Sequence, residues 1–151
     1  MDIRHATLET CSQATGMVVV IDVLRAFTTA CFAFEAGAED IVLVSTVEEA
    51  LALWQQIPGA LVMGEVGGYR PEGFDFGNSP SALVNVDLTG RRMIQRTSAG
   101  VQGVVRSTGA EILLAASFVC AQATIRYIQS LSPDTVTLVP TDNRDGHGDC
   151  L

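Results

Sequence analysis

The sequence predicts an α/β fold in which a mostly parallel sheet lies between two layers of helices. Short apolar segments rich in β-branched residues alternate with helix-like segments along the whole chain. Parallel strands need crossover connections, and these crossovers are right-handed, so the alternation favours a three-layer α/β/α arrangement. The 151 residues suffice for one core. We therefore expect residues 1–151 to form a single domain.

Six segments have the composition of buried strands and are flanked by turn-forming residues. They are, in chain order, MVVVI (17–21), IVLV (41–44), ALVMG (60–64), RMIQ (92–95), EILLAA (111–116) and TVTLV (135–139). The segments between them that favour helices are RAFTTACFAFEAGA, TVEEALALWQQIPG, SPSALV, AGVQGVVRSTGA and CAQATIRYIQSLSP. Thr46 and Glu49 have the spacing of a capping box at the start of the second helix, and Pro58-Gly59 should end it.

The last predicted strand is followed by a polar stretch, PTDNRDGHGDCL, with no helical segment after it. An α/β unit normally packs a helix at this point. We therefore expect the domain to lack its carboxyl-terminal part. The acids of this stretch, Asp142, Asp145 and Asp149, follow a strand end and belong with the candidate cation ligands.

Composition excludes several classes of partner. The net charge of −8 disfavours nucleic acid and anionic membranes, since binding to phosphates is driven by Lys and Arg. No apolar run approaches the ~20 residues of a membrane span, and the amino terminus lacks a secretory signal pattern. We expect a cytoplasmic protein whose four separated cysteines are free thiols. The 48% hydrophobic content favours a homo-oligomer.

Ligands of open α/β sheets bind beyond the carboxyl ends of the strands. Asp22 follows the first predicted strand, and Arg25 comes three residues later. Glu65 follows the third strand, and the fourth is followed by the segment from Arg96 to Gly100. Because parallel strands end at one edge, we expect these residues to lie near one another.

The segment GFDFGNSP (73–80) is a glycine-bearing loop that should run into a helix. Ser79 has the position of a capping residue, and Pro80 suits the first helical turn. A helix amino terminus carries unpaired N–H groups and favours an anion, so the loop is a candidate phosphate-binding segment. Helix capping alone is the alternative.

The side chains at these positions suit a phosphate ester and a divalent cation. The carboxylates of Asp22, Glu65 and Asp75 are ligands that Mg²⁺ prefers. Arginine recognises phosphate or sulfonate through its planar fork, and amides and hydroxyls donate to the remaining oxygens. These substrate-binding candidates are Arg25, Asn78, Ser79, Arg96, Ser98 and Gly100. Helix capping by Asp22 or Ser98, a surface ion pair of Arg25, and solvation of loop acids remain alternatives.

Four segments in order resemble the 2-phosphosulfolactate phosphatase family, the ComB-like phosphatases associated with coenzyme M biosynthesis. They are IDVLRAFTTA (21–30), GEVGGYRPEGFDFGNSP (64–80), RTSAGVQG (96–103) and ASFVCAQAT (116–124). The resemblance extends over about residues 18–149. It departs at Val101, where family members often carry threonine, and at the carboxyl end, where the family continues.

The resemblance implies an Mg²⁺-dependent hydrolase that converts 2-phospho-3-sulfolactate to sulfolactate and phosphate. It implies catalytic roles for Asp22, Arg25 and Glu65, and metal binding by Asp22, Glu65 and Asp75. Two alternatives remain: a phosphatase for another small phosphorylated hydroxy acid, or a non-catalytic anion-binding scaffold.

Overall fold

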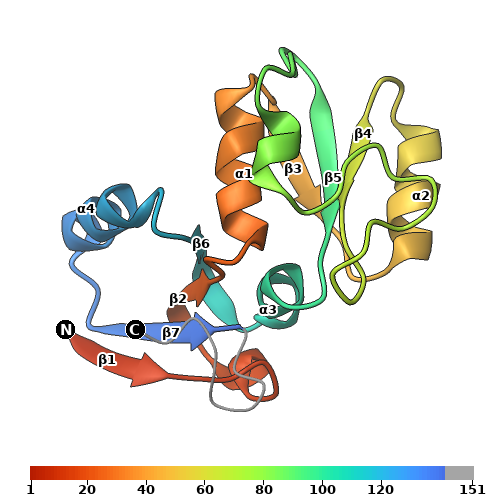
Figure 1. Cartoon of the computed structure of the whole chain (residues 1–151). Coiled ribbons are helices and arrows are strands. Elements are labelled where there is room, and N and C mark those ends of the chain that lie inside the picture. Colours follow the sequence, from red (N-terminus) through yellow and green to blue (C-terminus); the bar gives the residue numbers. More distant parts are fainter. Residues whose placement is uncertain (142–151) are drawn as a thin grey trace.

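The strands of the structure all pair in parallel, which confirms the predicted α/β class with helices on both sides of parallel sheets. The structure is a computed structural model that describes residues 1–141 (Figure 1). The strands divide between two sheets, a division that the expectation of one sheet did not include. Cys150 and the polar segment that contains Asp142, Asp145 and Asp149 lie outside the described residues.

The first sheet has the strand order β1-β7-β2-β6 and the second has the order β3-β5-β4. The strands are β1 (Asp2–His5), β2 (Gly16–Ile21), β3 (Asp40–Leu43), β4 (Leu61–Gly64), β5 (Arg92–Arg96), β6 (Ala110–Ala116) and β7 (Thr135–Pro140). The helices are α1 (Ala26–Glu35), α2 (Val47–Gln56), α3 (Gly100–Arg106) and α4 (Ala121–Leu131), with single 3-10 turns η1 (Cys11–Gln13) and η2 (Pro80–Leu83).

Helices cover both faces of each sheet, because the inner strands β2, β7 and β5 carry apolar side chains on both faces. In β2, Val18 and Val20 pack towards α1, while Met17 and Val19 pack towards α4. In the second sheet, Met93 faces α1 and η2, whereas the next residue, Ile94, faces α2. This alternation follows from the two-residue repeat of a strand. Figure 1 shows α1 and α2 on opposite sides of β3, β5 and β4.

Helix α1 connects the two sheets. Its first turn, with Ala26 and Phe27, packs in the core of the first sheet, and Ala33 near its end packs in the core of the second. Gln95 of β5 adds a polar link, since its side-chain Nε2 donates to the carbonyl oxygen of Ala26 at 2.9 Å. The start of α1 is therefore held by residues of both sheets.

The capping box at the start of α2 is confirmed. The backbone N of Glu49 donates to Thr46 Oγ1 at 3.1 Å, and the backbone N of Thr46 donates to Glu49 Oε2 at 3.2 Å. Helix α2 ends at Gln56, just before Pro58-Gly59, where Gly59 has φ of +79°. Within residues 1–141 no helix combines the length and the apolar character that a bilayer span requires.

Two details differ from the prediction. The edge strand β1 was not predicted, because all four of its residues are exposed and its sequence DIRH has no apolar pattern. The predicted helix SPSALV is only the four-residue 3-10 turn η2, and the Ser79 side chain makes no capping bond there. The Ser79 hydroxyl instead pairs with the Ser81 hydroxyl at 3.0 Å. The predicted helix amino terminus at Ser79 is therefore absent, and a four-residue turn provides little of the dipole on which the predicted phosphate site depended.

Candidate active site

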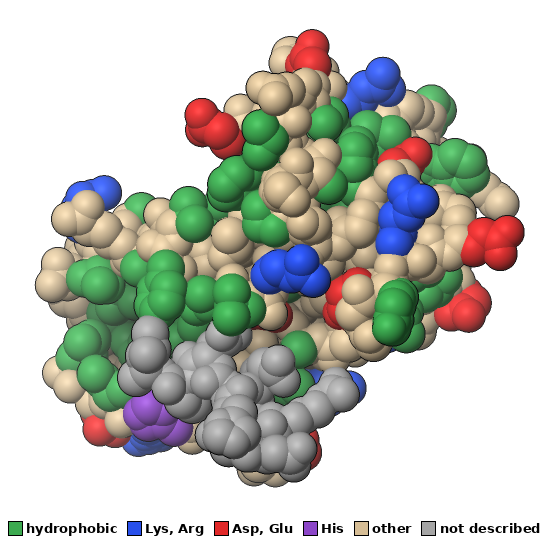
Figure 2. All heavy atoms as spheres, in the orientation of Figure 1, with side chains coloured by type: hydrophobic (Ala, Val, Ile, Leu, Met, Phe, Trp, Pro, Cys, Tyr) green, Lys and Arg blue, Asp and Glu red, His purple; other side chains and the backbone are tan. Residues whose placement is uncertain are grey.

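A polar cavity of about 330 Å³ lies where the loops after β2, β4 and β5 meet. Its lining residues are Asp22, Leu24, Arg25, Glu65, Gly67, Gly68, Asn78, Ser98 and Ala99. These loops follow the carboxyl ends of strands from both sheets, as expected for a ligand site of an α/β fold. Figure 2 shows acidic and basic side chains close together around a hollow near the middle of the face in view.

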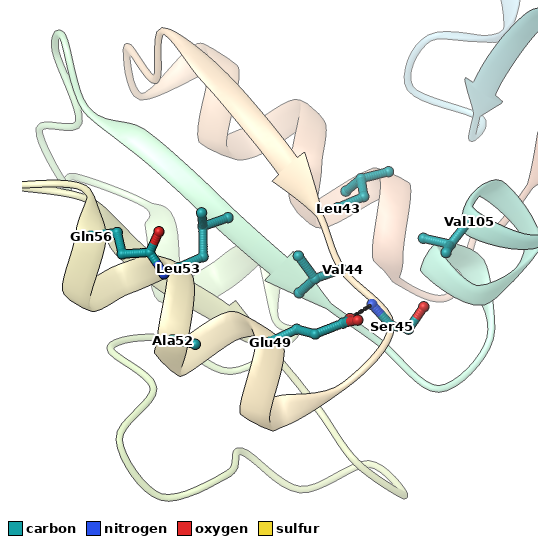
Figure 3. A pocket seen from close by; sticks show the side chains of 8 residues that line it. All are labelled: Leu43, Val44, Ser45, Glu49, Ala52, Leu53, Gln56 and Val105. Atoms are coloured by element: carbon teal, nitrogen blue, oxygen red, sulfur yellow. Dashed lines mark hydrogen bonds between the residues drawn. The ribbon is translucent and has the colours of Figure 1, made fainter.

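A larger open groove of about 460 Å³ lies beside α2 and the end of β3 (Figure 3). Its lining is mostly apolar, with Leu43, Val44, Leu53 and Val105 among its residues. Its one carboxylate, Glu49, already accepts from the backbone N of Ser45 at 2.9 Å. The groove therefore offers little chemistry, and the smaller polar cavity is the better candidate site.

Asp22 is buried at the end of β2, with 4% of its surface exposed. Its Oδ1 accepts from the backbone N of Ala26 at 2.9 Å, and Thr141 Oγ1 donates to its Oδ2 at 3.4 Å. The N-cap residue of α1 is Arg25, but the first contact shows that Asp22 satisfies the N–H of the first helical residue, a role close to the capping alternative considered for it. Capping and a role in the cavity are compatible, because the carboxylate also belongs to the cavity lining.

Glu65 is held by three hydrogen-bond donors. Ser98 donates to its carboxylate through both its backbone N and its hydroxyl, and the backbone N of Gly68 donates to Oε2 at 2.7 Å. The Ser98 hydroxyl in turn accepts from the backbone N of Gly67 at 3.1 Å. Glu65 and Ser98 therefore fix the loops after β4 and β5 to each other, and Glu65 is oriented at the cavity wall.

The two candidate arginines have different positions. Arg96 does not line the cavity: its guanidinium donates to the carbonyl oxygens of Glu65 at 2.7 Å and Ser45 at 3.2 Å, and to Ser98 Oγ at 3.2 Å. Through these contacts Arg96 ties together the loops that follow β3, β4 and β5. Arg25 is exposed at the cavity and forms no ion pair within residues 1–141, so the alternative of a surface ion pair is not observed there.

The loop GFDFGNSP lies along the edge strand β4. The carbonyl oxygen of Val62 accepts from the backbone N of Asp75 and of Phe76, and Asp75 Oδ2 accepts from the backbone N of Val62 at 2.8 Å. Asp75 is exposed and does not line the cavity. The arrangement does not support the predicted metal group of Asp22, Glu65 and Asp75, because the Asp75 carboxylate satisfies the β4 backbone instead.

Asn78 is the residue of this loop that reaches the cavity, whereas Ser79 is absent from its lining. Asn78 Oδ1 is buried and has no hydrogen-bond partner among the described residues. Mg²⁺ is usually held by one or two carboxylates together with water and substrate phosphate. Asp22, Glu65 and the Asn78 oxygen supply ligands of this kind, so the donors present fit Mg²⁺. Over residues 1–141 no group of three acidic, His or Cys side chains suited to a metal forms.

Gly100 is adjacent to Asp22 and is not among the residues that line the cavity. A Cβ at this position would lie 2.5 Å from Asp22 Oδ2 and 2.8 Å from Ala26 Cβ. Glycine thus leaves the space that the Asp22 carboxylate occupies. Val101 is fully buried, so the side chain at this departure from the family pattern faces the core.

The sequence analysis assigned no catalytic, substrate or metal role to four lining residues, Leu24, Gly67, Gly68 and Ala99, or to two supporting hydroxyls, although Thr97 and Ala99 lie in the predicted strand-end segment. Thr97 Oγ1 accepts from the backbone N of Val101 at 3.0 Å, and Thr141 contacts Asp22. The glycine pair after Glu65 was the available signal. Gly67 and Gly68 have φ of +58° and +89°, which lets the loop turn back so that the Gly68 N–H reaches the Glu65 carboxylate.

A family model described as 2-phosphosulpholactate phosphatase matches residues 3–148. The chain belongs to this family. Similar proteins include a "Probable 2-phosphosulfolactate phosphatase" of Carboxydothermus hydrogenoformans, 43% identical over 80% of this chain and 50% of its own length. Proteins with the same name from Bacillus subtilis and Deinococcus radiodurans are 36% and 38% identical, over 87% and 91% of this chain and 58% and 59% of their own lengths. The chain thus spans between half and three-fifths of the length of these relatives.

Proposed function

We propose that this chain provides the catalytic cavity of an Mg²⁺-dependent phosphatase that hydrolyses the phosphate ester of 2-phospho-3-sulfolactate. The observation that carries the proposal is that Asp22, Glu65, Arg25 and Asn78 line one cavity at the carboxyl ends of strands. The names of the 2-phosphosulfolactate phosphatase relatives support the substrate class. The cavity volume of about 330 Å³ lies in the range of small-molecule sites.

The roles follow from position and charge. Arg25, exposed at the cavity, pairs with an anionic group of the substrate, because a planar guanidinium binds phosphate, sulfonate or carboxylate through two parallel hydrogen bonds. Asp22 lies at the end of β2 and either binds the cation or attacks phosphorus. Glu65, fixed by Ser98 and Gly68, presents a rigid carboxylate to the same space. When bound, Mg²⁺ neutralises phosphate charge and polarises the phosphoryl group.

Phosphate release tests the proposal. Asp22→Asn should lower turnover of 2-phospho-3-sulfolactate by orders of magnitude, while Asp134→Asn, an exposed acid before β7, should not change it. Omission of Mg²⁺ or addition of a chelator should abolish turnover. Near-normal turnover of the Asp22 variant would remove Asp22 from the mechanism, and full activity without a divalent cation would refute the metal requirement.

Arg25→Lys should reduce kcat/KM by the equivalent of about 1–3 kcal/mol, the range for a hydrogen bond to a charged group. Among residues 1–141 one guanidinium, that of Arg25, lines the cavity, and the sulfonate and phosphate groups compete for it. A panel of phosphorylated hydroxy acids without a sulfonate therefore tests the second candidate substrate class. If these compounds had the same kcat/KM as 2-phospho-3-sulfolactate, the sulfonate would not be recognised.

A further inference from the structure

Gln95 is a polar residue whose burial does not favour stability. It lies in β5, the central strand of the second sheet, and none of its surface is exposed. Its Nε2 donates to the carbonyl oxygen of Ala26 at 2.9 Å, whereas its Oε1 is buried and has no hydrogen-bond partner within residues 1–141. Burial of an amide oxygen without a partner costs free energy. An apolar side chain of similar size would avoid this cost, so stability alone does not account for a glutamine at this position.

The hydrogen bond of the Gln95 amide leads to Asp22 through a single residue. Ala26 accepts from Gln95 through its carbonyl oxygen and donates to Asp22 Oδ1 through its backbone N at 2.9 Å. Ala26 is the first residue of α1, and the N-cap residue Arg25 makes no side-chain capping bond to the described part of the chain. A helix end without such a bond frays more easily. Gln95 and Asp22 therefore hold, from two sides, the residue at which α1 begins.

We propose that Gln95 is a positioning residue for Asp22 in the phosphatase reaction. By holding the Ala26 carbonyl oxygen from the second sheet, Gln95 fixes the place of the Ala26 N–H, and this N–H orients the Asp22 carboxylate. The inference rests on the proposed function, because Asp22 is the residue that there binds the cation or attacks phosphorus. Replacing a residue that orients a metal ligand typically changes affinity or activity by about 10- to 100-fold.

Thr29 offers a matched control on the same helix. It lies one turn after Ala26, none of its surface is exposed, and its Oγ1 has no hydrogen-bond partner among residues 1–141. Because this hydroxyl bonds to neither Ala26 nor Asp22, Thr29→Val removes a buried polar atom and leaves the positioning contact in place. Gln95→Met removes that contact and keeps an unbranched side chain that can fill the same space.

Enzyme kinetics, urea unfolding and amide hydrogen exchange of the two variants test the proposal. Gln95→Met should lower kcat for 2-phospho-3-sulfolactate about 10- to 100-fold, because Asp22 loses its fixed orientation. Its KM should stay within about 2-fold of the parent value, since the exposed Arg25 side chain still binds the anion. The urea midpoint should be no lower than that of the parent, and the N–H of Ala26 should exchange faster. Thr29→Val should match the parent in kcat and in exchange.

Several results would overturn the proposal. An unchanged kcat or an unchanged Ala26 exchange rate in Gln95→Met would do so. A urea midpoint well below that of the parent, or an equal fall of kcat in Thr29→Val, would show a merely structural role. In the unmodified chain the side-chain amide protons of Gln95 should exchange slowly, and fast exchange would refute the contact without any variant. If the parent releases no phosphate, the proposed function fails, whereas the exchange measurements still decide whether Gln95 supports the bond between Ala26 and Asp22.

Discussion

Replacement of Gly100 by alanine is the sharpest test of how the cavity is built. The new Cβ would lie 2.5 Å from Asp22 Oδ2, about 0.9 Å closer than ordinary van der Waals contact, and 2.8 Å from Ala26 Cβ. Both neighbours are buried, and Asp22 is tied to the start of α1. The carboxylate must therefore move, or α1 and α3 must separate.

The expected change in the free energy of unfolding follows from two opposing effects. Overpacking of a closed site costs about 1–3 kcal/mol. Alanine in place of glycine in a helix recovers up to ~1 kcal/mol, and Gly100 has no positive φ that alanine would strain. We expect a net loss of roughly 1–2 kcal/mol in the free energy of unfolding. A shift of nearly 1 Å in Asp22 should also reduce turnover about 100-fold.

Urea unfolding and phosphate release measure the two effects. Gly77→Ala is the matched control, because its Cβ would meet only Arg70 Cβ at 3.7 Å, an ordinary contact. This control should remain within ~0.5 kcal/mol of the parent in stability. If Gly100→Ala matched the parent in both stability and turnover, the argument that Gly100 leaves space for Asp22 would be refuted.

Two further predictions concern side chains outside the cavity. Asp75→Ala should lower the free energy of unfolding in urea by about 1–3 kcal/mol, because it leaves the buried N–H of Val62 without its acceptor. Asp75→Asn keeps an acceptor and should leave Mg²⁺ affinity unchanged. A large loss of metal affinity in Asp75→Asn would instead restore Asp75 as a ligand. The hydrogen bond from Arg92 lowers the pKa of Asp40, so this pair stabilises the fold above the ordinary aspartate pKa, and its contribution disappears as pH falls through the lowered pKa. Arg92→Gln should flatten that part of the curve of melting temperature against pH, and an unchanged curve would contradict the assignment.

The sequence predicted those elements whose signals are local. The capping box of α2 depends on residues three apart, and the six predicted strands are apolar on both faces, so composition alone indicated them. Strand β1 was not predicted, because an exposed edge strand has no burial pattern. The division into two sheets depends on pairing between distant strands, such as β2 with β7, which a single sequence does not encode locally.

The candidate site shows a similar limit. The rule that ligands bind at strand ends brought Asp22, Glu65 and Ser98 together correctly, because position along a parallel strand decides the edge at which a residue lies. It did not decide the direction of a side chain. Arg96 also ends a strand, yet its guanidinium contacts the carbonyl oxygens behind the cavity. Asp75 lies outside the cavity lining, because a loop acid can also satisfy a neighbouring backbone N–H.

The strand order has a consequence for synthesis of the chain on the ribosome. All three strands of the second sheet lie between Asp40 and Arg96, so that sheet can assemble as soon as this segment has emerged. The first sheet must wait, since β2 needs β6 and β7, and β1 pairs Asp2 with Thr135. During that interval β2, apolar on both faces, has neither neighbour. The nascent chain should therefore depend most on chaperone protection between the emergence of β2 and that of β7.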